Sequence, residues 1–236
     1  MALTIQRIRQ PGPLLDLVHQ QLLVTSFPVN ERVDPADLAS AVAAGHTEVF
    51  VGRDRIGEPV ATVIGDWYPT ATVMLLAYLA VTDHGRGQGW GSQLLDHAVT
   101  QWRTRLAPNL ILAEVERPDR HAGSAEHGNP RARLRFYERH GARALDLPHF
   151  QPALGPTTEP VPGLLLTALH VTSEGTGPDT ETVAGAPVLA FLRRYLGATA
   201  DTPAGRRLLD AADRPGGIRL VPLEAWRRIP AGDPQR

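Results

Sequence analysis

Residues 79–92 read Leu79-Ala80-Val81-Thr82-Asp83-His84-Gly85-Arg86-Gly87-Gln88-Gly89-Trp90-Gly91-Ser92 and connect an apolar, strand-like segment to an amphipathic, helical one. Glycine loses more backbone freedom on folding than other residues, so four alternating glycines indicate that the backbone here must turn tightly or approach a ligand closely. Such a segment turns tightly, and a helix that begins within it directs free N–H groups and a partial positive charge toward an anion. The stretch therefore predicts a phosphate-binding loop, and the alternative is a flexible connection without a ligand.

Two common phosphate loops do not fit this stretch. The dinucleotide pattern G-x-G-x-x-G would need glycine where Trp90 or Ser92 stands, and a Walker A loop needs a lysine. The chain has no lysine, because all 24 basic residues are arginine, and it has no cysteine. These absences exclude a lysine Schiff base, a thiolate nucleophile, disulfides and cysteine-ligated metals.

The composition is that of a globular chain with a large core. Of its 236 residues 42% are hydrophobic, and 25 acidic against 24 basic residues leave a formal charge of −1. We expect neither nucleic acid nor a membrane as a partner, since both are held by a basic field that this chain lacks. The first residues lack a signal-peptide core and no run of about 18 apolar residues follows, so we expect a cytoplasmic protein.

The histidines show no metal-binding pattern. No pair has the H-E-x-x-H spacing, and without cysteine a zinc site would need three scattered ligands. We therefore predict that no metal is bound and that the four histidines between residues 121 and 149 lie at the surface. These are His121, His127, His140 and His149.

Hydrophobic periodicity predicts alternating groups of strands and helices around the loop. The predicted strands are 3–9, 48–53, 59–67, 72–81, 110–116, 143–147 and 164–171. The predicted helices are 13–25, a second one from Asp34-Pro35, 89–106 and 131–140, the last ending at Gly141. Beyond residue 172 a linker-like stretch is followed by helical patterns around 188–196 and 206–212.

Two segments resemble motifs of one family. Arg86-Gly87-Gln88-Gly89-Trp90-Gly91 is similar to the R/Q-x-x-G-x-G/A loop of the GCN5-related N-acetyltransferase (GNAT) superfamily. Arg135-Phe136-Tyr137-Glu138-Arg139-His140-Gly141-Ala142 resembles its later helix signature, and the element order agrees over about residues 3–171. The resemblance implies an α/β (α+β) fold with a mixed, mostly antiparallel seven-stranded sheet flanked by helices. It implies a GNAT domain over 1–172, with 173–236 as a linker and helical C-terminal extension.

The resemblance also implies a cosubstrate, acetyl-CoA, and residues that bind it. The pyrophosphate would be held by the backbone of Arg86, Gly87, Gln88, Gly89, Trp90, Gly91 and Ser92. The pantetheine arm would pair with the backbone of Leu79, Ala80 and Val81. Tyr137 would protonate the departing thiolate; the alternative is an aromatic side chain that only packs on the core. Asn129 does not match the family's asparagine position, so we interpret it as a helix cap.

Glu114 and Glu116 are the candidate general bases. Strand alternation puts both side chains on one face, where repulsion between the carboxylates favours protonation of one of them. We prefer Glu116 over Glu114. The alternative is that both pair with arginines such as Arg117 or Arg120 and have no catalytic role.

The expected function is direct transfer of an acetyl group from acetyl-CoA to a primary amine of a small-molecule or peptide acceptor. The alternative is a non-catalytic acyl-CoA-binding module that acts in regulation or assembly. Three roles remain open for the extension: it covers the acceptor side, forms a homodimer, or enlarges the core.

Overall fold

The computed structural model describes residues 3–123 and 128–235. The chain forms two compact units. Unit 1 consists of Met1–Trp67 with Met74–Ala107, and unit 2 consists of Tyr68–Val73 with Pro108–Arg236. The glycine loop therefore belongs to unit 1, whereas Tyr137, Glu114 and Glu116 belong to unit 2. No helix in the described part of the chain is both long enough and apolar enough to cross a membrane.

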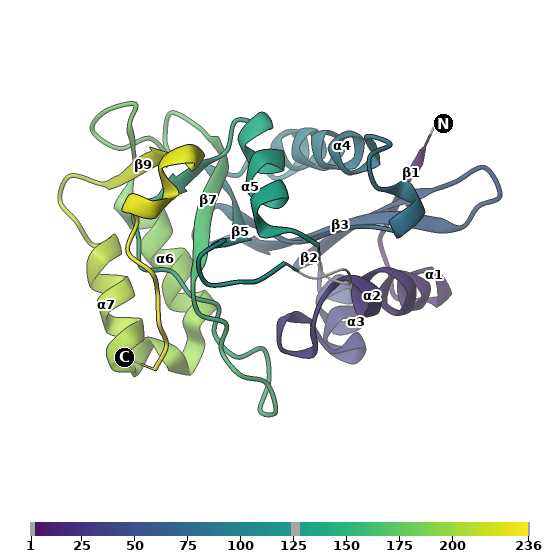
Figure 1. The fold of residues 1–236 in the computed structure, drawn as a ribbon, viewed down its shortest axis with the longest axis horizontal. Coiled ribbons are helices and arrows are strands. Elements are labelled where there is room, and N and C mark those ends of the chain that lie inside the picture. The colour runs from purple at the N-terminus through teal and green to yellow at the C-terminus, as the bar shows by residue number, and fades with distance from the viewer. Residues whose placement is uncertain (1–2, 124–127, 236) are drawn as a thin grey trace. The chain divides into compact units, whose positions relative to one another are not determined.

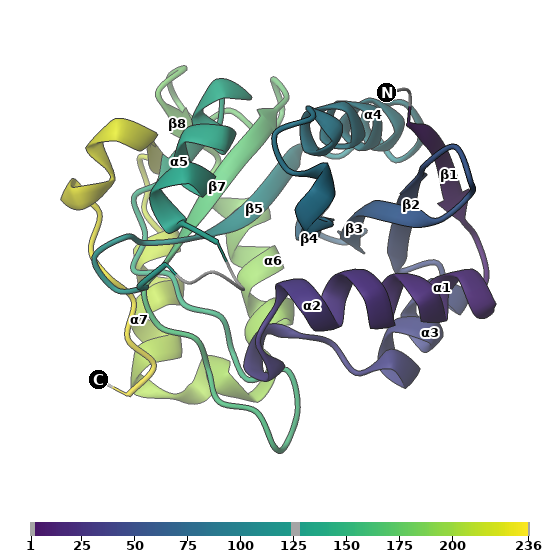
Figure 2. The same cartoon turned by 45° about the vertical axis from the view of Figure 1, so that its right-hand side comes forward.

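Unit 1 is a sheet with helices on both faces. Its strands are β1 (Thr4–Ile8), β2 (Thr47–Arg53), β3 (Pro59–Tyr68) and β4 (Val73–Val81), in that order. Its α-helices are α1 (Pro13–Val18), α2 (Val24–Ser26), α3 (Pro35–Ala43) and α4 (Trp90–Arg105). The strand pairs β1–β2 and β2–β3 are antiparallel. Helix α4 covers one face of the sheet, and α1, α2 and α3 lie on the other (Figures 1 and 2).

Close packing of α4 on β3 sets the position of the helix that follows the loop. Trp102 of α4 is fully buried beside Gly65 of β3. A methyl group on Gly65 would lie 2.5 Å from the Trp102 ring, so only glycine allows this approach. Interior packing is dense enough that one added carbon would displace the helix.

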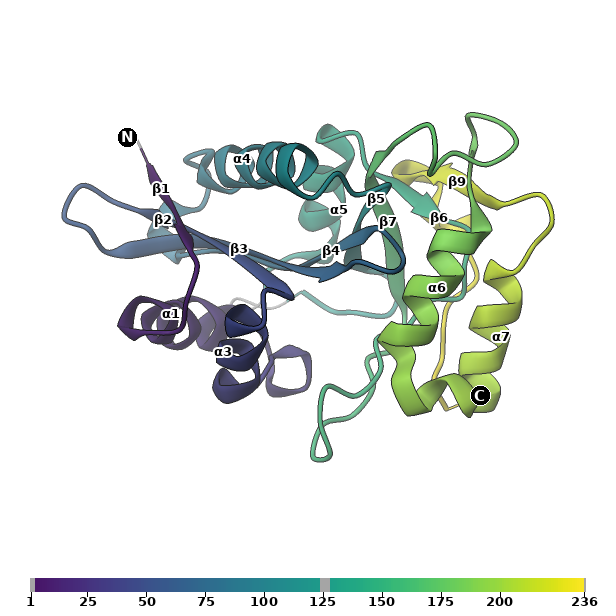
Figure 3. The same cartoon turned by 180° about the vertical axis from the view of Figure 1, so that it is seen from behind.

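Unit 2 contains an antiparallel sheet to which the C-terminal extension contributes. The order is β5 (Leu110–Glu116), β7 (Leu164–Val171), β6 (Arg143–Leu145), β9 (Ile218–Pro222) and β8 (Thr182–Val183). All four neighbouring pairs are antiparallel. Helix α5 (Pro130–Arg139) lies on one face, while α6 (Gly185–Leu196) and α7 (Pro203–Ala212) lie side by side on the other (Figures 1 and 3).

Three helices begin with the same local device, a capping side chain followed by proline. Asp34 accepts from the N–H of Ala36, Asn129 from that of Arg131, and Thr202 from that of Gly205. Each cap satisfies a free helix N–H, and proline at the first helical position sacrifices no hydrogen bond. The prediction that Asn129 is a cap is thus confirmed. Gly141 has φ 75°, as expected for a left-handed residue after a helix.

The predicted GNAT-like architecture is confirmed, with one difference in strand number. The described residues contain nine strands rather than seven. The two additional strands, β8 and β9, come from the extension, which also contains the predicted helices. Strand β8 is two residues long and β9 is five, too short for a clear alternation of apolar and polar residues. Such short strands form because a distant partner strand offers its edge, here β6 for β9.

Candidate functional site

The glycine loop of unit 1 uses its glycines for two physical reasons. Gly87 and Gly89 have φ of 79° and 78°, the left-handed region in which a side chain is strained. Gly85 has a packing role, because a methyl group there would lie 2.5 Å from the Trp90 ring. The loop therefore combines a fixed backbone path with a close contact to the first residue of α4.

This backbone path leaves a row of N–H groups available. In the described chain, no backbone acceptor bonds the following five N–H groups: Gly87, Gly89, Trp90, Gly91 and Ser92. The first bond of the helix is donated by Gln93 to the carbonyl of Gly89, at 3.0 Å. Unsatisfied donors at the positive end of a 16-residue helix make a site for an anion such as a phosphate.

The side chains of the loop have supporting roles. Trp90 is buried, so it can offer a ligand its main chain but not its ring. Gln88 donates from its side chain to the carbonyl of His84 at 2.7 Å, which stabilises the turn. Arg86 pairs with Asp83 at 3.0 Å in an exposed ion pair.

Strand β4 leads into this loop and carries the predicted pantetheine-binding segment. Leu79 and Val81 are half-buried, and Ala80 between them is buried. One residue earlier, the Tyr78 hydroxyl accepts a hydrogen bond from the N–H of Val33 at 2.9 Å. Tyr78 is thus occupied in anchoring the segment that follows α2.

Tyr137 lies on α5 in unit 2 and is buried. No described residue forms a hydrogen bond with its hydroxyl, and Phe136 contacts the ring edge-on at 5.3 Å between centroids. Burial raises the pKa of Tyr137 to about 12, although the charge of Arg133 acts in the opposite direction. The group is therefore a neutral phenol, able to donate its proton, throughout the physiological range. Its ring packs on the core as the alternative interpretation requires, but the hydroxyl has no hydrogen-bond partner in the part of the chain that the structure describes.

Glu116, the preferred base, has both carboxylate oxygens close to cationic or titratable partners. Its Oε2 accepts from Nη1 of Arg133 at 2.6 Å, and its Oε1 lies 3.7 Å from Nδ1 of His121. The alternative that Glu116 pairs with an arginine therefore agrees with the structure, but the arginine is Arg133 rather than Arg117 or Arg120. Arg117 instead pairs with Asp119 at 3.1 Å and donates to the carbonyl of Ile229 at 2.6 Å.

Glu114 takes part in a different cluster, with one residue from the connection between β6 and β7 and one from α6. Its Oε1 lies 2.6 Å from Nε2 of His149 and accepts from the Tyr195 hydroxyl, also at 2.6 Å. His149 is fully buried, so the prediction that it lies at the surface is wrong. His121 and His140 are half-buried, and His127 lies outside the described residues.

The surroundings of His149 indicate which ring nitrogen carries the hydrogen. The carboxylate of Glu114 can only accept, so Nε2 donates. Nδ1 is buried and has no hydrogen-bond partner among the described residues. A hydrogen on Nδ1 would be a buried donor without an acceptor, which costs about 1–3 kcal/mol. The geometry favours the tautomer with its hydrogen on Nε2.

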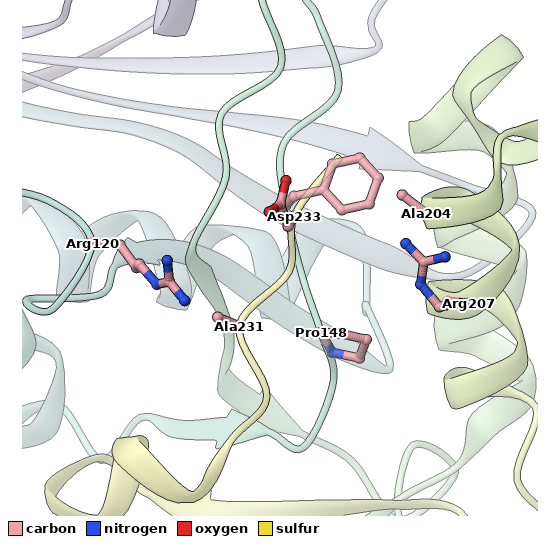
Figure 4. Close-up of a pocket in the computed structure, with 7 residues that line it drawn as sticks. Arg120, Pro148, Ala204, Arg207, Ala231 and Asp233 are labelled. Carbon is pink, nitrogen blue, oxygen red and sulfur yellow. The ribbon is translucent and has the colours of Figure 1, made fainter. Parts of the chain in front are cut away.

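Unit 2 contains a cavity of about 310 Å³ (Figure 4). It is lined by Arg120, Pro148, Phe150, Ala204, Arg207, Ala231 and Asp233. Pro148 and Phe150 line this cavity, whereas His149 between them bonds to the Glu114 carboxylate. One short segment therefore contacts both the cavity and Glu114. Figure 4 shows Arg120 and Arg207 coming from different elements. The described residues contain no group of three or more metal-ligating side chains.

Sequence reasoning identified Glu114, Glu116 and Tyr137 but missed the side chains that contact them. Tyr195 lies in the helical pattern predicted around 188–196, and Arg133 lies in the helix predicted over 131–140, but neither pattern indicates a contact with a glutamate. Local patterns predict that such residues face the core or the solvent. They contain no signal for a partner that lies 81 residues away, as Glu114 does from Tyr195.

Comparisons with known proteins agree with the fold. The family model of the acetyltransferase (GNAT) domain matches residues 45–141. A GNAT-family acetyltransferase from Bacteroides thetaiotaomicron is 21% identical with a TM-score of 0.53, over 72% of this chain and 87% of its own. A Bacillus subtilis acetyltransferase in complex with CoA is 14% identical with a TM-score of 0.50, over 72% of this chain and 100% of its own. No curated protein matches the chain.

The likeness to the solved structures concerns the fold, and the family match concerns the region with both sequence motifs. Residues 45–141 include the glycine loop and Tyr137 with the signature around it. Residues 45–141 are therefore similar to the acetyltransferase (GNAT) domain, and the chain shares its fold with a GNAT-family acetyltransferase.

Proposed function

We propose that the protein transfers an acetyl group directly from acetyl-CoA to a primary amine of a small-molecule or peptide acceptor. The observation that carries the proposal is the group of five N–H groups, at Gly87 and from Gly89 to Ser92, that no backbone acceptor in the described chain bonds. Such a row suits the pyrophosphate of a coenzyme A thioester. The Bacillus subtilis acetyltransferase of similar fold is in complex with CoA, which supports the same ligand class here.

In this proposal Tyr137 is the acid and Glu114 the base. Tyr137 is a buried phenol without a hydrogen-bond partner among the described residues, and its pKa of about 12 means that it carries its proton near neutral pH. Between the two glutamates, the contacts favour Glu114, because Arg133 occupies Oε2 of Glu116 at 2.6 Å and His121 lies near its other oxygen. Both hydrogen bonds to Glu114 fall on Oε1, which leaves Oε2 for an amine.

The transfer balances without a covalent enzyme intermediate. The acceptor ammonium loses one proton to water by way of Glu114, and the free amine attacks the thioester carbonyl. The N–C bond forms, the C–S bond breaks, and the nitrogen loses a second proton to water. The sulfur gains a proton from the Tyr137 hydroxyl, which then recovers one from water. In this proposal a backbone N–H group of residues 79–81 polarises the thioester carbonyl.

The test is a panel of primary amines incubated with acetyl-CoA and the full chain, with free thiol as the readout. We expect amine-dependent thiol release, and calorimetry should show binding of coenzyme A. If coenzyme A binds but no amine increases thiol release, the chain is a non-catalytic acyl-CoA-binding module. If coenzyme A does not bind either, the assignment of the glycine loop is wrong as well.

A further inference from the structure

We propose that the C-terminal extension, residues 173–236, completes the acceptor site by supplying Tyr195, which together with His149 positions the Glu114 carboxylate for a cationic primary amine. The inference rests on the proposed function and goes beyond it, because it assigns a role to the extension and a chemical class to the acceptor. Tyr195 and His149 are positioning residues, since they act on the amine through Glu114.

Only one of the two carboxylate oxygens of Glu114 accepts hydrogen bonds from the described residues. Oε1 receives both, from Nε2 of His149 and from the Tyr195 hydroxyl, each at 2.6 Å. No described group bonds to Oε2, and 15% of the Glu114 side chain is exposed. Two donors on one oxygen fix the plane of the carboxylate, so Oε2 points in a defined direction and remains available to a ligand.

An aromatic stack holds the Tyr195 hydroxyl in place. The Tyr195 ring lies 5.9 Å from the His149 ring at 23° and 5.2 Å from the Phe191 ring at 23°. Phe191 is fully buried and meets Tyr68 edge-on at 4.9 Å. A ring that stacks on two neighbouring rings loses little further freedom when its hydroxyl bonds to Glu114, so the arrangement is preorganised.

The end of the extension supports His149 from a second direction. Gly232 packs so closely on the carbonyl of His149 that a side chain at this position would clash. Just before it, the carbonyl of Ile229 accepts from Arg117 at 2.6 Å, and the Arg117 guanidinium lies 5.2 Å from the centre of the Trp226 ring. Two separate parts of the extension, α6 and the last residues, therefore contact the residues that hold Glu114.

The chemistry of Oε2 selects the acceptor class. A carboxylate oxygen accepts a charge-assisted hydrogen bond from an ammonium group, which is about twice as strong as a bond between neutral partners. Alcohols and aromatic amines lack this positive charge near neutral pH. We therefore expect aliphatic primary amines that are cationic in solution to be acetylated in preference to both.

The experiment compares the steady-state kinetics of the full-length wild type and the variant Tyr195→Phe. This variant keeps the stacked ring and removes only the hydroxyl bond to Glu114. We expect kcat/KM for an alkyl amine to fall about tenfold or more, the effect of losing one hydrogen bond to a charged group, while KM for acetyl-CoA stays unchanged. The preference for alkyl amines over aromatic amines should fall with it.

The matched control is Thr167→Val. The Thr167 hydroxyl also bonds to β5, donating to the carbonyl of Ala113 at 2.9 Å, but it forms no hydrogen bond with Glu114. This control should lose stability without the selective loss of amine kcat/KM. His149→Gln retains a donor toward Glu114 and should keep more activity than His149→Leu.

The outcomes separate the inference from the function on which it rests. An active wild type whose amine kcat/KM is the same after Tyr195→Phe, or falls equally after Thr167→Val, would overturn the role of the extension alone. A wild type that binds coenzyme A but acetylates no amine would overturn the proposed function and this inference together. Equal use of alkyl and aromatic amines by the wild type would overturn the acceptor class.

Discussion

Arg133 donates from Nη1 to Oε2 of Glu116 at 2.6 Å, and the same guanidinium opposes the burial that raises the pKa of Tyr137. Arg133 and Tyr137 are four residues apart on α5, which puts them on one face of the helix. One cation therefore affects both the carboxylate first preferred as base and the candidate acid. It neutralises the carboxylate and makes the phenol a better proton donor than burial alone would.

Replacing this cation should weaken the acid. In Arg133→Gln only burial still acts on the pKa of Tyr137, so this pKa should rise further. A phenol with a higher pKa is a weaker acid, and kcat should therefore fall several-fold. Steady-state rates with saturating acetyl-CoA measure the effect. Arg135→Gln, an exposed change on the same helix, is the control and should leave kcat unchanged. Equal rates in the two variants would show that Arg133 does not act on the chemical step.

Removal of the Tyr137 hydroxyl should separate chemistry from binding. Tyr137→Phe should lower kcat by about 10²-fold or more, the usual contribution of a positioned general acid, with little change in coenzyme A affinity. In the wild type, a pKa of about 12 means that the phenol loses its proton only at very alkaline pH. No decline of kcat between pH 7 and 10 should therefore come from this group. Unchanged turnover in the variant would remove Tyr137 from the mechanism.

The two glutamates on β5 should respond differently to neutralisation. Glu114→Gln should abolish most amine-dependent thiol release, because the base would be lost. Glu116→Gln should have a smaller effect, because its carboxylate is already paired with Arg133. Parallel measurements of kcat/KM for one amine decide between them. The reverse order of effects would restore Glu116 as the base.

The glycine loop can be tested with two side chains of nearly equal size. Asparagine and aspartate both tolerate the left-handed backbone that Gly89 adopts at φ 78°, and no atom lies within 4 Å of a side-chain carbon placed there. Gly89→Asp adds a negative charge next to the free N–H groups and should abolish coenzyme A binding. Gly89→Asn should weaken binding far less. Calorimetry with coenzyme A measures both, and equal affinities would contradict the pyrophosphate assignment.

Elements with local signals could be predicted from the sequence, whereas contacts between distant residues could not. Asn129-Pro130 and Gly141 mark the ends of α5 to within a residue, because caps and breakers act on their neighbours. The pairing of β9 with β6 and of Tyr195 with Glu114 depends on how the extension packs within unit 2. No short pattern encodes that packing, which is why the extension was predicted to be helical only.

The same limit applies to the candidate site. The glycines of the loop are informative in sequence alone, because each one loses backbone conformational entropy on folding and four in alternation therefore indicate a structural or ligand-binding requirement. The sequence around His149 does not predict its burial, because a lone histidine between Pro148 and Phe150 carries no local signal for a buried position. Its partners come from β5 and α6, and its lack of exposure follows from tertiary packing alone.

Stability of unit 1 should depend on Glu48, which lies far along the chain from every proposed catalytic group. Its buried carboxylate bonds to Arg7 at 2.6 Å and Arg105 at 2.8 Å. Burial by itself opposes ionisation of Glu48, but the hydrogen bonds and charges of Arg105 and Arg7 outweigh it and hold the pKa below the usual 4.5. The ionised pair therefore stabilises the fold fully above that pH, and this contribution is lost as the pH falls from 4.5 through the lowered pKa.

Glu48→Gln should destabilise the fold by about 3 kcal/mol at neutral pH, because two arginines would lose a buried counter-charge. It should also flatten the decline in stability below pH 4.5. Thermal unfolding at a series of pH values measures both effects, with the exposed change Glu58→Gln as the control. An acid transition that is as steep in Glu48→Gln as in the control would show that other carboxylates cause it.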